Sequence, residues 1–350
     1  MSKDIIEQFS PTLLSWHESI DRPLPWKNIS DPYLIWVSEI ILQQTRAGQA
    51  IPYYHSITER FPTLNSLATA PIDELLSLWQ GLGYYSRARN LHSSAKMIME
   101  IFNGVFPNKY DDIISLKGVG KYTAAAISSF AFGLPYPVVD GNVIRIISRY
   151  FDVGEPVDTK KGLGIINSFV DLVFDESKPA RFNQAIMDFG ATLCLPKLPL
   201  CNKCPFVASC QSYDRGLQME RPIKSKKLVR KIRYFNFLLI FNKTKVLIQR
   251  RNVKDIWQGL YQLPLLEGNQ FSKKGSLINE IKNQWNKNVC VEPIFTHKQT
   301  LTHQIIHSII WSVDKSKLII EDGIWVEKSD LKNYGFPKTI ALFFEKYSLL

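Results

Sequence analysis

Four of the five cysteines in the chain lie within one short segment. Cys194, Cys201, Cys204 and Cys210 follow the spacing C-x6-C-x2-C-x5-C, and Cys290 lies far from them. Four thiols this close together are typical of a loop that binds a metal ion or an iron–sulfur cluster. Structural zinc sites usually combine two closely spaced cysteine pairs, and this loop has one such pair. The spacing therefore favours an iron–sulfur cluster over the two other interpretations, a single zinc ion and four unrelated buried thiols.

The length and composition predict a folded protein of two domains. The 350 residues are 45% hydrophobic and 12% aromatic, which excludes a disordered or low-complexity chain. No apolar run approaches the roughly 20 residues of a membrane span. Residues 1–11 carry acids and lack the cationic and apolar pattern of a signal peptide. We therefore expect a cytoplasmic protein without a membrane partner, in which cysteines do not form disulfides.

The positive charge of the chain is concentrated toward its C-terminus. The net charge is +11, of which residues 1–214 contribute −2 and residues 215–350 contribute +13. A strongly basic chain favours an anionic partner, and nucleic acid is the commonest large one. Charge alone does not identify the partner, so the motifs must decide.

Three regions differ in pattern along the chain. Residues 1–214 show amphipathic helical periodicity interrupted by glycines, residues 215–233 form a basic connector, and residues 234–350 are rich in β-branched runs. We predict a helical region, an exposed linker and a mixed α/β domain. The expected helices are 33–45, 73–79, 87–102, 122–131, 142–150, 163–173, 182–193, 277–285 and 338–347, and the expected strands are 234–241, 245–250, 305–313 and 318–320.

Two glycines precede an alanine-rich helical segment in the middle of the helical region. Gly118 and Gly120 frame the turn, and Lys121 directly precedes the predicted helix. Glycines permit a tight turn, and the free amides at a turn and helix start can hold a phosphate oxygen. The turn alone is equally consistent with an ordinary corner between two helices.

Several segments, taken with the cysteine spacing, give the chain a specific resemblance. It resembles the helix-hairpin-helix DNA glycosylases of the endonuclease III superfamily, and within them the MutY-type adenine DNA glycosylases. The resemblance covers most of residues 20–212 and continues more weakly through residues 256–264 into a domain that resembles a Nudix fold. The matching segments are 31–33, 36–45, 81–91, the glycine turn at 116–126, 138–143 and the four clustered cysteines.

The resemblance implies an architecture. It predicts an all-α helical region at 1–214, made of a six-helix module at about 30–137 and an iron–sulfur module from 1–29 and 138–214. Residues 215–233 become the interdomain linker, and 234–350 become a Nudix-like domain that recognises 8-oxoguanine. Cys194, Cys201, Cys204 and Cys210 would hold a [4Fe-4S] cluster that staples the fold.

Two acids are the expected centre of catalysis. Glu39 has apolar neighbours, and burial of that kind raises the pKa of a carboxyl so that it can act as a general acid. Asp140 precedes Gly141 and a helical run, where an aspartate commonly caps a helix. The resemblance implies that Glu39 protonates adenine at N7 and that Asp140 stabilises the positive charge on the deoxyribose. Asn142 is implied as a positioning residue beside Asp140.

Tyr122 is a departure with consequences. Lyase-type relatives carry a lysine at this position, and its amine forms a Schiff base with the sugar. Tyr122 lacks an amine, and Ile144 stands where some members have a second lysine. We therefore expect a monofunctional glycosylase, in which Tyr122 hydrogen-bonds near Asp140.

The resemblance also implies residues that bind the DNA. Adenine in a duplex is out of reach, so it must be flipped out of the helix. Leu82 and Tyr84 are implied as wedge residues. The remaining implied contacts are Gln44 and Thr45 for the opposite base, Arg22, Trp26 and Gln184 for the adenine pocket, and Gly118, Gly120 and Lys121 for the DNA backbone.

The C-terminal domain departs from both enzymes that it resembles. Residues 275–292 lack the glutamate-rich pattern of a Nudix hydrolase, so nucleotide hydrolysis is not expected. Leu301-Thr302-His303 stands where the glycosylases usually have Phe-Ser-His, and Thr302 keeps the hydroxyl that can reach the lesion. We expect a monomer that acts on double-stranded DNA with A:8-oxoguanine or A:G mismatches, in the nucleoid if the source is bacterial.

Three other functions remain open at this point. They are a thymine or uracil glycosylase on the same scaffold, a bifunctional lyase, and a DNA-binding module without catalysis. The first does not need the C-terminal domain, the second needs a lysine at position 122, and the third does not need Glu39.

Overall fold

The computed structural model describes residues 3–225, 229–270, 273–285, 289–314, 320 and 322–348. Its backbone divides into two compact units. Unit 1 comprises Met1–Ala68 and Ser93–Lys227, and unit 2 comprises Thr69–His92 and Leu228–Leu350. The helical residues 69–92 therefore group with the C-terminal part of the chain. The module boundaries implied by the resemblance remain a prediction.

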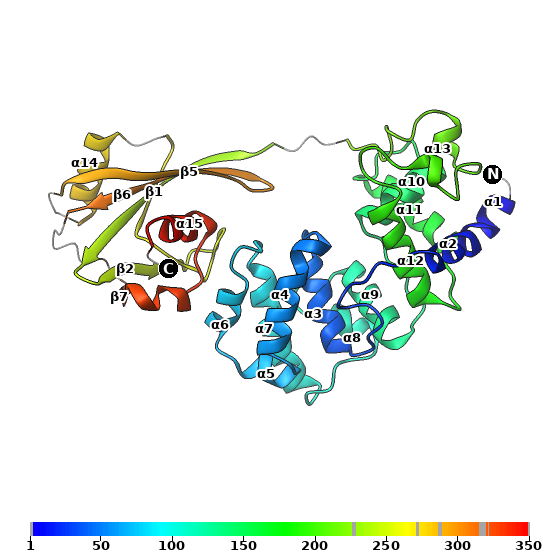
Figure 1. The fold of residues 1–350 in the computed structure, drawn as a ribbon, viewed down its shortest axis with the longest axis horizontal. Helices are drawn as coiled ribbons and strands as arrows, with labels where there is room; N and C mark the ends of the chain where they lie inside the picture. Colours follow the sequence, from blue (N-terminus) through cyan, green and yellow to red (C-terminus); the bar gives the residue numbers. More distant parts are fainter. Residues whose placement is uncertain are drawn as a thin grey trace. The chain divides into compact units, whose positions relative to one another are not determined.

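Unit 1 is helical. Figure 1 shows α10, α11, α12 and α13 gathered with α2, next to the marked N-terminus. Helix α7 (Ser86–Ile101) begins in unit 2 and continues in unit 1. The other helices of this unit are α1 (Lys3–Glu7), α2 (Phe9–Glu18), α3 (Pro32–Leu42), α4 (Ala47–Arg60), α5 (Leu64–Thr69), α8 (Tyr110–Ile114), α9 (Lys121–Phe132), α10 (Gly141–Tyr150), α11 (Lys160–Val173), α12 (Pro179–Thr192), the 3-10 turn Cys201–Lys203 and α13 (Gln211–Asp214).

Local sequence explains where the two helices that carry the predicted acids begin. The Asp31 carboxylate accepts the Tyr33 backbone N–H at 2.8 Å, and Pro32 occupies the first turn of α3, where no amide is needed. Asp140 caps α10 in the same way, through the backbone N–H groups of Asn142 and Val143. Both helix starts are thereby fixed by a side chain.

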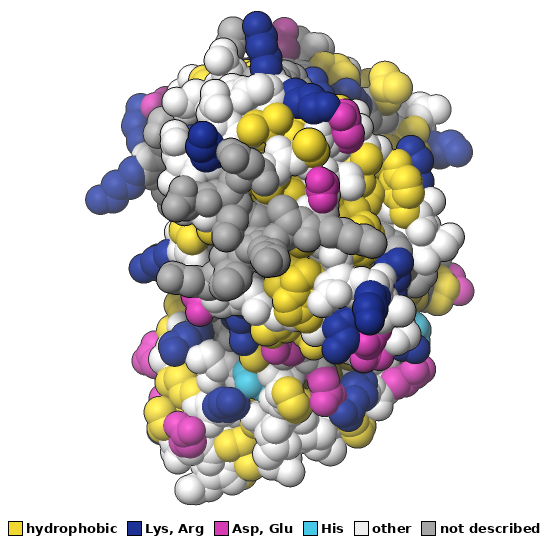
Figure 2. All heavy atoms as spheres, turned by 90° about the vertical axis from the view of Figure 1, so that its left-hand side faces the viewer, with side chains coloured by type: hydrophobic (Ala, Val, Ile, Leu, Met, Phe, Trp, Pro, Cys, Tyr) yellow, Lys and Arg dark blue, Asp and Glu magenta, His cyan; other side chains and the backbone are white. Residues whose placement is uncertain are grey.

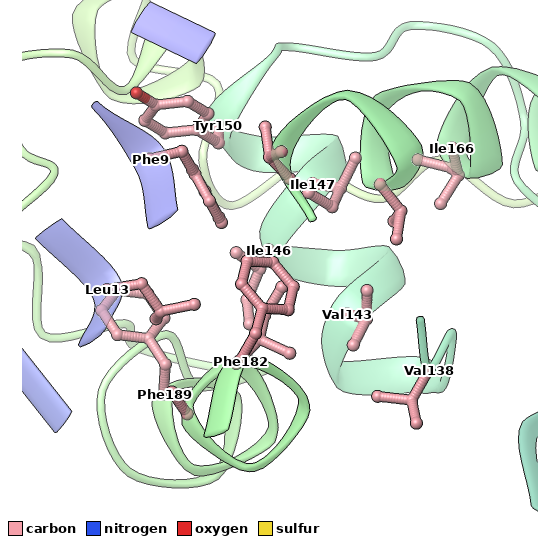
Figure 3. Close-up of a cluster of buried hydrophobic side chains, with 14 of the residues drawn as sticks. Phe9, Leu13, Val138, Val143, Ile146, Ile147, Tyr150, Ile166, Phe182 and Phe189 are labelled. Carbon is pink, nitrogen blue, oxygen red and sulfur yellow. The ribbon is translucent and has the colours of Figure 1, made fainter. Parts of the chain in front are cut away.

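One core joins α2, α10, α11 and α12. Phe9 and Leu13 of α2 lie against apolar side chains of α10 and α12, and all are nearly inaccessible to solvent (Figure 3). The rings of Phe9 and Phe206 stack with their centroids 4.9 Å apart, which ties this core to the cysteine loop. The other labelled members in the figure are Val138, Val143, Ile146, Ile147, Tyr150, Ile166, Phe182 and Phe189.

Unit 2 contains a mixed sheet. Its strand order is β3-β2-β1-β6-β5, with β4 paired to β1 and β7 paired to β2. Strands β1 and β6 run parallel, and the other pairs are antiparallel. The elements are α6 (Ile72–Leu78), β1 (Lys231–Asn242), β2 (Lys245–Arg250), β3 (Tyr261–Gln262), β4 (Leu265–Gly268), α14 (Lys274–Trp285), β5 (Val291–Thr300), β6 (Gln304–Val313), β7 (Gly323–Glu327), the 3-10 turn Lys328–Asn333 and α15 (Lys338–Lys346).

Helices cover the sheet of unit 2, as Figure 1 shows for α14 and α15. Leu238 and Ile240 of β1 share a core with Leu277 and Ile281 of α14. Phe343 of α15 contacts a ring of β5, that of Phe295, with centroids 5.6 Å apart. Figure 2 shows Lys and Arg side chains spread among acidic and hydrophobic ones on the pictured face.

The predicted fold class, a helical region followed by a mixed α/β domain, is confirmed. Most predicted helices and the strands at 234–241, 245–250 and 305–313 lie within or close to observed ones. Residues 318 and 319 of the fourth predicted strand, and 226–228 of the predicted linker, lie outside the described residues. Within the described part of the chain, no helix is both long enough and apolar enough to cross a bilayer.

Candidate active site

A cavity of about 1080 Å³ in unit 1 contains most of the predicted catalytic and adenine-pocket residues. Helices α2, α3, α4, α9, α10 and α12 and the segment between α2 and α3 line it. Sequence positions as far apart as 22 and 184 therefore meet at one site. The predicted residues in its lining are Arg22, Trp26, Glu39, Thr45, Tyr122, Asp140, Asn142 and Gln184.

Glu39 is the most deeply buried carboxyl that faces this cavity. Only 4% of the residue is exposed, and its Oε2 has no hydrogen-bond partner among the described residues. Burial raises the pKa of Glu39 from 4.5 to about 7, and the nearby charge of Asp140 adds to the rise, while a hydrogen bond with Tyr122 opposes it. A carboxyl with this pKa holds a proton near neutral pH and can donate it to a bound group.

Tyr122 lies between the two acids. Burial and the neighbouring Glu39 and Asp140 raise the pKa of its hydroxyl well above 10, so it remains protonated. The hydroxyl also donates to the Met187 sulfur at 3.2 Å. Tyr122 therefore serves as a neutral donor in the site and supplies no amine.

Asp140 is held by three donors. Its carboxylate accepts the backbone N–H groups of Asn142 and Val143 and the Asn142 side-chain amide, each at 2.8 Å. The pKa of Asp140 is raised above its ordinary value because the group is buried, and these hydrogen bonds and the charge of Arg145 limit the rise. The two acids thus differ in environment, because Asp140 has donors that favour its charged form and Glu39 has an unpartnered oxygen.

A buried arginine connects this acid to the cysteine loop. Arg145 donates to the Asn142 side chain at 2.8 Å, to the Gly190 carbonyl at 2.7 Å and to the Cys194 carbonyl at 2.8 Å. Gly190 allows α12 to approach this closely, because a Cβ there would lie 2.6 Å from the Asn142 Cβ. Arg145 and Gly190 are positioning residues that the motif analysis missed.

A fully buried acid beside the cavity was also missed. Asp188 on α12 accepts Arg22 at 2.5 Å, Lys27 at 2.6 Å and His17 at 2.9 Å. These hydrogen bonds and cations lower the pKa of Asp188 to about 2, although burial acts against them. Arg22 is therefore paired with Asp188. The ion pairs of Arg22 and Lys27 with Asp188 hold the segment between α2 and α3, which forms part of the cavity wall. Two cations in a segment expected to line a pocket were the only sequence signal for a buried counter-ion.

The glycine turn leads into α9 as predicted. Gly118 has φ 81°, Gly120 caps α9, and Lys121 is exposed at its first position. The side-chain amide of Gln43 donates to the Gly118 carbonyl at 3.1 Å and to Thr123 at 3.2 Å, which fixes the turn against the end of α3. Gln44, next to it, is exposed with φ 58° and lies outside the cavity lining.

The four clustered cysteines share a small cavity. Cys194, Cys201, Cys204 and Cys210 line a space of about 30 Å³, and Arg149 points a nitrogen at the Cys194 sulfur from 3.4 Å. No group of three or more His, Cys, Asp or Glu among the described residues converges on a point where one ion would sit. A four-iron cluster binds each thiolate at a separate iron and does not require such convergence. Four thiols around one space are a donor set that could hold an iron–sulfur cluster.

Four of the residues predicted to contact DNA or the lesion line a second cavity, which lies within unit 2, whereas Gln44 and Thr45 belong to unit 1. The cavity measures about 390 Å³ and is lined by Leu82, Tyr84, Thr302 and His303 among others. The hydroxyls of Tyr84 and Thr302 hydrogen-bond to each other. Residues 81–89 and the loop at 299–304 therefore form one site, although about 220 residues separate them in sequence.

Comparisons with known proteins identify the family of the chain. Residues 37–163 match the model of the HhH-GPD superfamily base excision DNA repair proteins, and residues 236–346 match the NUDIX domain model. The chain is 33% identical over 345 residues to an adenine DNA glycosylase of Buchnera aphidicola subsp. Baizongia pistaciae, covering 97% of this chain and 96% of that protein. The chain belongs to the adenine DNA glycosylase family.

A second relative matches over part of the chain. The adenine DNA glycosylase of Mus musculus is 40% identical over 220 residues, which cover 60% of this chain and 42% of the mouse protein. Members of the adenine DNA glycosylase family are hydrolases of N-glycosyl bonds in base excision repair. The resemblance to this family inferred from the sequence is confirmed.

Solved structures support the helical fold. A thermostable thymine-DNA glycosylase matches with TM-score 0.54 and 30% identity, over 59% of this chain and 96% of that one. A non-covalent endonuclease III–DNA complex matches with TM-score 0.54 and 20% identity, over 62% of this chain and 99% of that one, and shows the fold alone.

Proposed function

We propose that this adenine DNA glycosylase flips adenine out of duplex DNA and removes it when it lies opposite 8-oxoguanine or guanine. The observation that carries the proposal is the single cavity that unites Glu39, which has an unpartnered buried oxygen, with the capped carboxylate of Asp140. A neutral acid and a charged carboxylate at one site match the two needs of N-glycosidic bond cleavage.

The proposed reaction divides the work between these acids. Glu39 donates its proton to N7 of the flipped adenine, and the C1′–N9 bond then breaks with its electron pair leaving on the base. Asp140 stabilises the positive charge that develops on the deoxyribose. Water adds to C1′ and gives up a proton, which returns to the ionised Glu39. The products are free adenine and an abasic site.

Positioning within the cavity follows from its lining. Asn142 orients Asp140 through its side-chain amide, and Tyr122 supplies a neutral hydroxyl between the acids. Gln184 and Trp26 are assigned to the adenine, and Arg22 acts with Asp188 to hold the pocket wall. Tyr122 cannot form a Schiff base, which supports a monofunctional glycosylase.

We assign binding of the opposite base to the second cavity. The hydroxyls of Tyr84 and Thr302 face one another there, next to Leu82 and His303. A hydroxyl at 302 can hydrogen-bond a lesion base in the absence of the usual phenylalanine. In unit 1, Gln44 and Thr45 are assigned to DNA binding, and the amides at Gly118, Gly120 and Lys121 to a DNA phosphate. The enzyme is proposed to act as a monomer in the DNA-associated cytoplasm.

We also assign a [4Fe-4S] cluster to the cysteine loop. When bound, it would cross-link four points of this loop. Cys194, Cys201, Cys204 and Cys210 would hold it, and Arg149 braces the loop through the Leu195 carbonyl at 2.6 Å and the Pro196 carbonyl at 3.1 Å.

Replacement of one clustered cysteine should remove the cluster. Cys204→Ser is expected to abolish bound iron and the visible absorbance of the purified protein, and to lower its melting temperature, because one of four iron ligands is lost. Cys290→Ser is the matched control, since Cys290 is exposed and lies outside the loop. Iron and sulfide analysis of both variants makes the comparison. Equal iron content in both would contradict the assignment.

The function is tested on duplexes that vary both bases of the mismatch. We expect release of free adenine from A:8-oxoguanine and A:G duplexes, without borohydride trapping of a covalent adduct. Release of thymine or uracil instead would favour the thymine or uracil glycosylase alternative. Efficient trapping would favour a lyase, and binding without base release would favour a DNA-binding module.

A further inference from the structure

The turn that carries Tyr84 has an unusual backbone. Gly81, Gly83 and Tyr84 all adopt positive φ, at 91°, 81° and 48°. Glycine accepts this conformation, whereas a tyrosine with positive φ is strained. Such a conformation persists only where surrounding contacts require it. Yet the Tyr84 ring is 45% exposed, so its own burial does not hold it there.

Two buried side chains, those of Trp79 and Arg87, donate hydrogen bonds to the backbone of this turn. The indole N–H of Trp79 donates to the Gly83 carbonyl at 3.1 Å, and the Arg87 guanidinium donates to the same carbonyl at 3.0 Å and to the Leu82 carbonyl at 3.4 Å. Trp79 is fully buried, and Arg87 is 6% exposed. The turn backbone therefore accepts hydrogen bonds from a residue that precedes it in sequence and from one that follows it.

The guanidinium also reaches the rings on either side. It lies 5.3 Å from the Trp79 ring centroid and 5.8 Å from that of Tyr84, both within cation–π range. Burial lowers the pKa of Arg87 to about 10, so the group remains charged at neutral pH. A planar fork that donates to two carbonyls while it lies over two rings cannot be reproduced by lysine.

We propose that Arg87 is a positioning residue that fixes Tyr84 in its wedge conformation before DNA binds. The inference rests on the proposed function, in which Tyr84 lies in the cavity assigned to the opposite base, and on the wedge role that the resemblance implies for it. Arg87 holds the strained turn in the free protein. The free-energy cost of ordering the Tyr84 turn therefore arises during folding and does not weaken DNA binding.

The test is a double-mutant cycle between positions 84 and 87, read by base flipping. The probe is a duplex with 2-aminopurine in place of the target adenine, whose fluorescence rises when the base is unstacked. We expect Tyr84→Ala and Arg87→Met each to reduce the flipped fraction about tenfold, and the double variant to resemble Tyr84→Ala. Lys96→Met is the matched control, because Lys96 is an exposed cation on the same helix.

The outcomes separate the inference from the function on which it rests. Unchanged flipping in Tyr84→Ala would overturn the wedge role of Tyr84 and the inference with it, whereas adenine release would still test the glycosylase assignment. Losses in the two single variants that multiply in the double variant would overturn the inference alone. If Arg87→Met does not fold, Arg87→Lys takes its place, and wild-type flipping in that variant would overturn the proposal.

Discussion

Glu39→Gln should release adenine about 10²–10⁴-fold more slowly than the wild-type protein in single-turnover assays. The amide has nearly the same shape as the acid but cannot transfer a proton, and general acid catalysis typically contributes 10²–10⁴-fold. The unpartnered Oε2 in the cavity is the atom expected to deliver that proton. Excision at the wild-type rate would exclude Glu39 as the acid.

A stability measurement separates this loss from misfolding. Burial raises the pKa of Glu39 from 4.5 to about 7, so the folded protein binds this proton more tightly than the unfolded chain does. The stability from the neutral carboxyl is therefore complete below pH 4.5 and decreases as the pH rises through about 7. Glu39→Gln avoids this loss, and its free energy of unfolding at pH 8 should exceed that of the wild type by up to roughly 3 kcal/mol.

Asp140→Asn should lower the rate of adenine release by roughly 10²–10³-fold, with little change in stability. An asparagine side chain can still accept the backbone N–H groups that begin α10, so the helix cap is retained. The lost quantity is the negative charge that stabilises the sugar cation, and electrostatic contributions of this kind are usually of that size. Single-turnover rates and thermal melting of the same sample give both quantities.

Asp140→Ala provides the comparison for this variant. Alanine removes the charge and the helix cap together. The free energy of unfolding of Asp140→Ala should therefore be about 1 kcal/mol lower than that of Asp140→Asn. If Asp140→Asn melts as early as Asp140→Ala while both retain activity, Asp140 caps the helix and does not act on the sugar.

The sequence alone predicted where three short motifs lie in the structure. The cysteine spacing, the glycine turn and Asp140 before Gly141 are local patterns, and each lies where its local pattern indicates, in a loop or at a helix start. Residue 39 could be singled out because apolar neighbours along one helix predict burial.

Local sequence patterns could not predict the contacts between residues that are far apart in the sequence. Asp188 is the one acid in α12, and only the folded chain shows that it pairs with Arg22 and Lys27. Arg145 and Gly190 acquire their roles through the close approach of α10 and α12, which periodicity does not specify. Helix α4 and strand β5 were likewise missed, since polar residues interrupt their patterns.

The proposed mechanism depends on a Glu39 carboxyl that keeps a proton up to about pH 7 while it lies beside Asp140. Difference infrared spectroscopy of wild type against Glu39→Gln tests it most directly, because a buried protonated carboxyl has a distinct carbonyl stretch. We predict that this band is present at pH 6, decreases with a midpoint near 7, and is absent in the variant. A band already absent at pH 6, with its midpoint near the ordinary value of 4.5, would contradict the account.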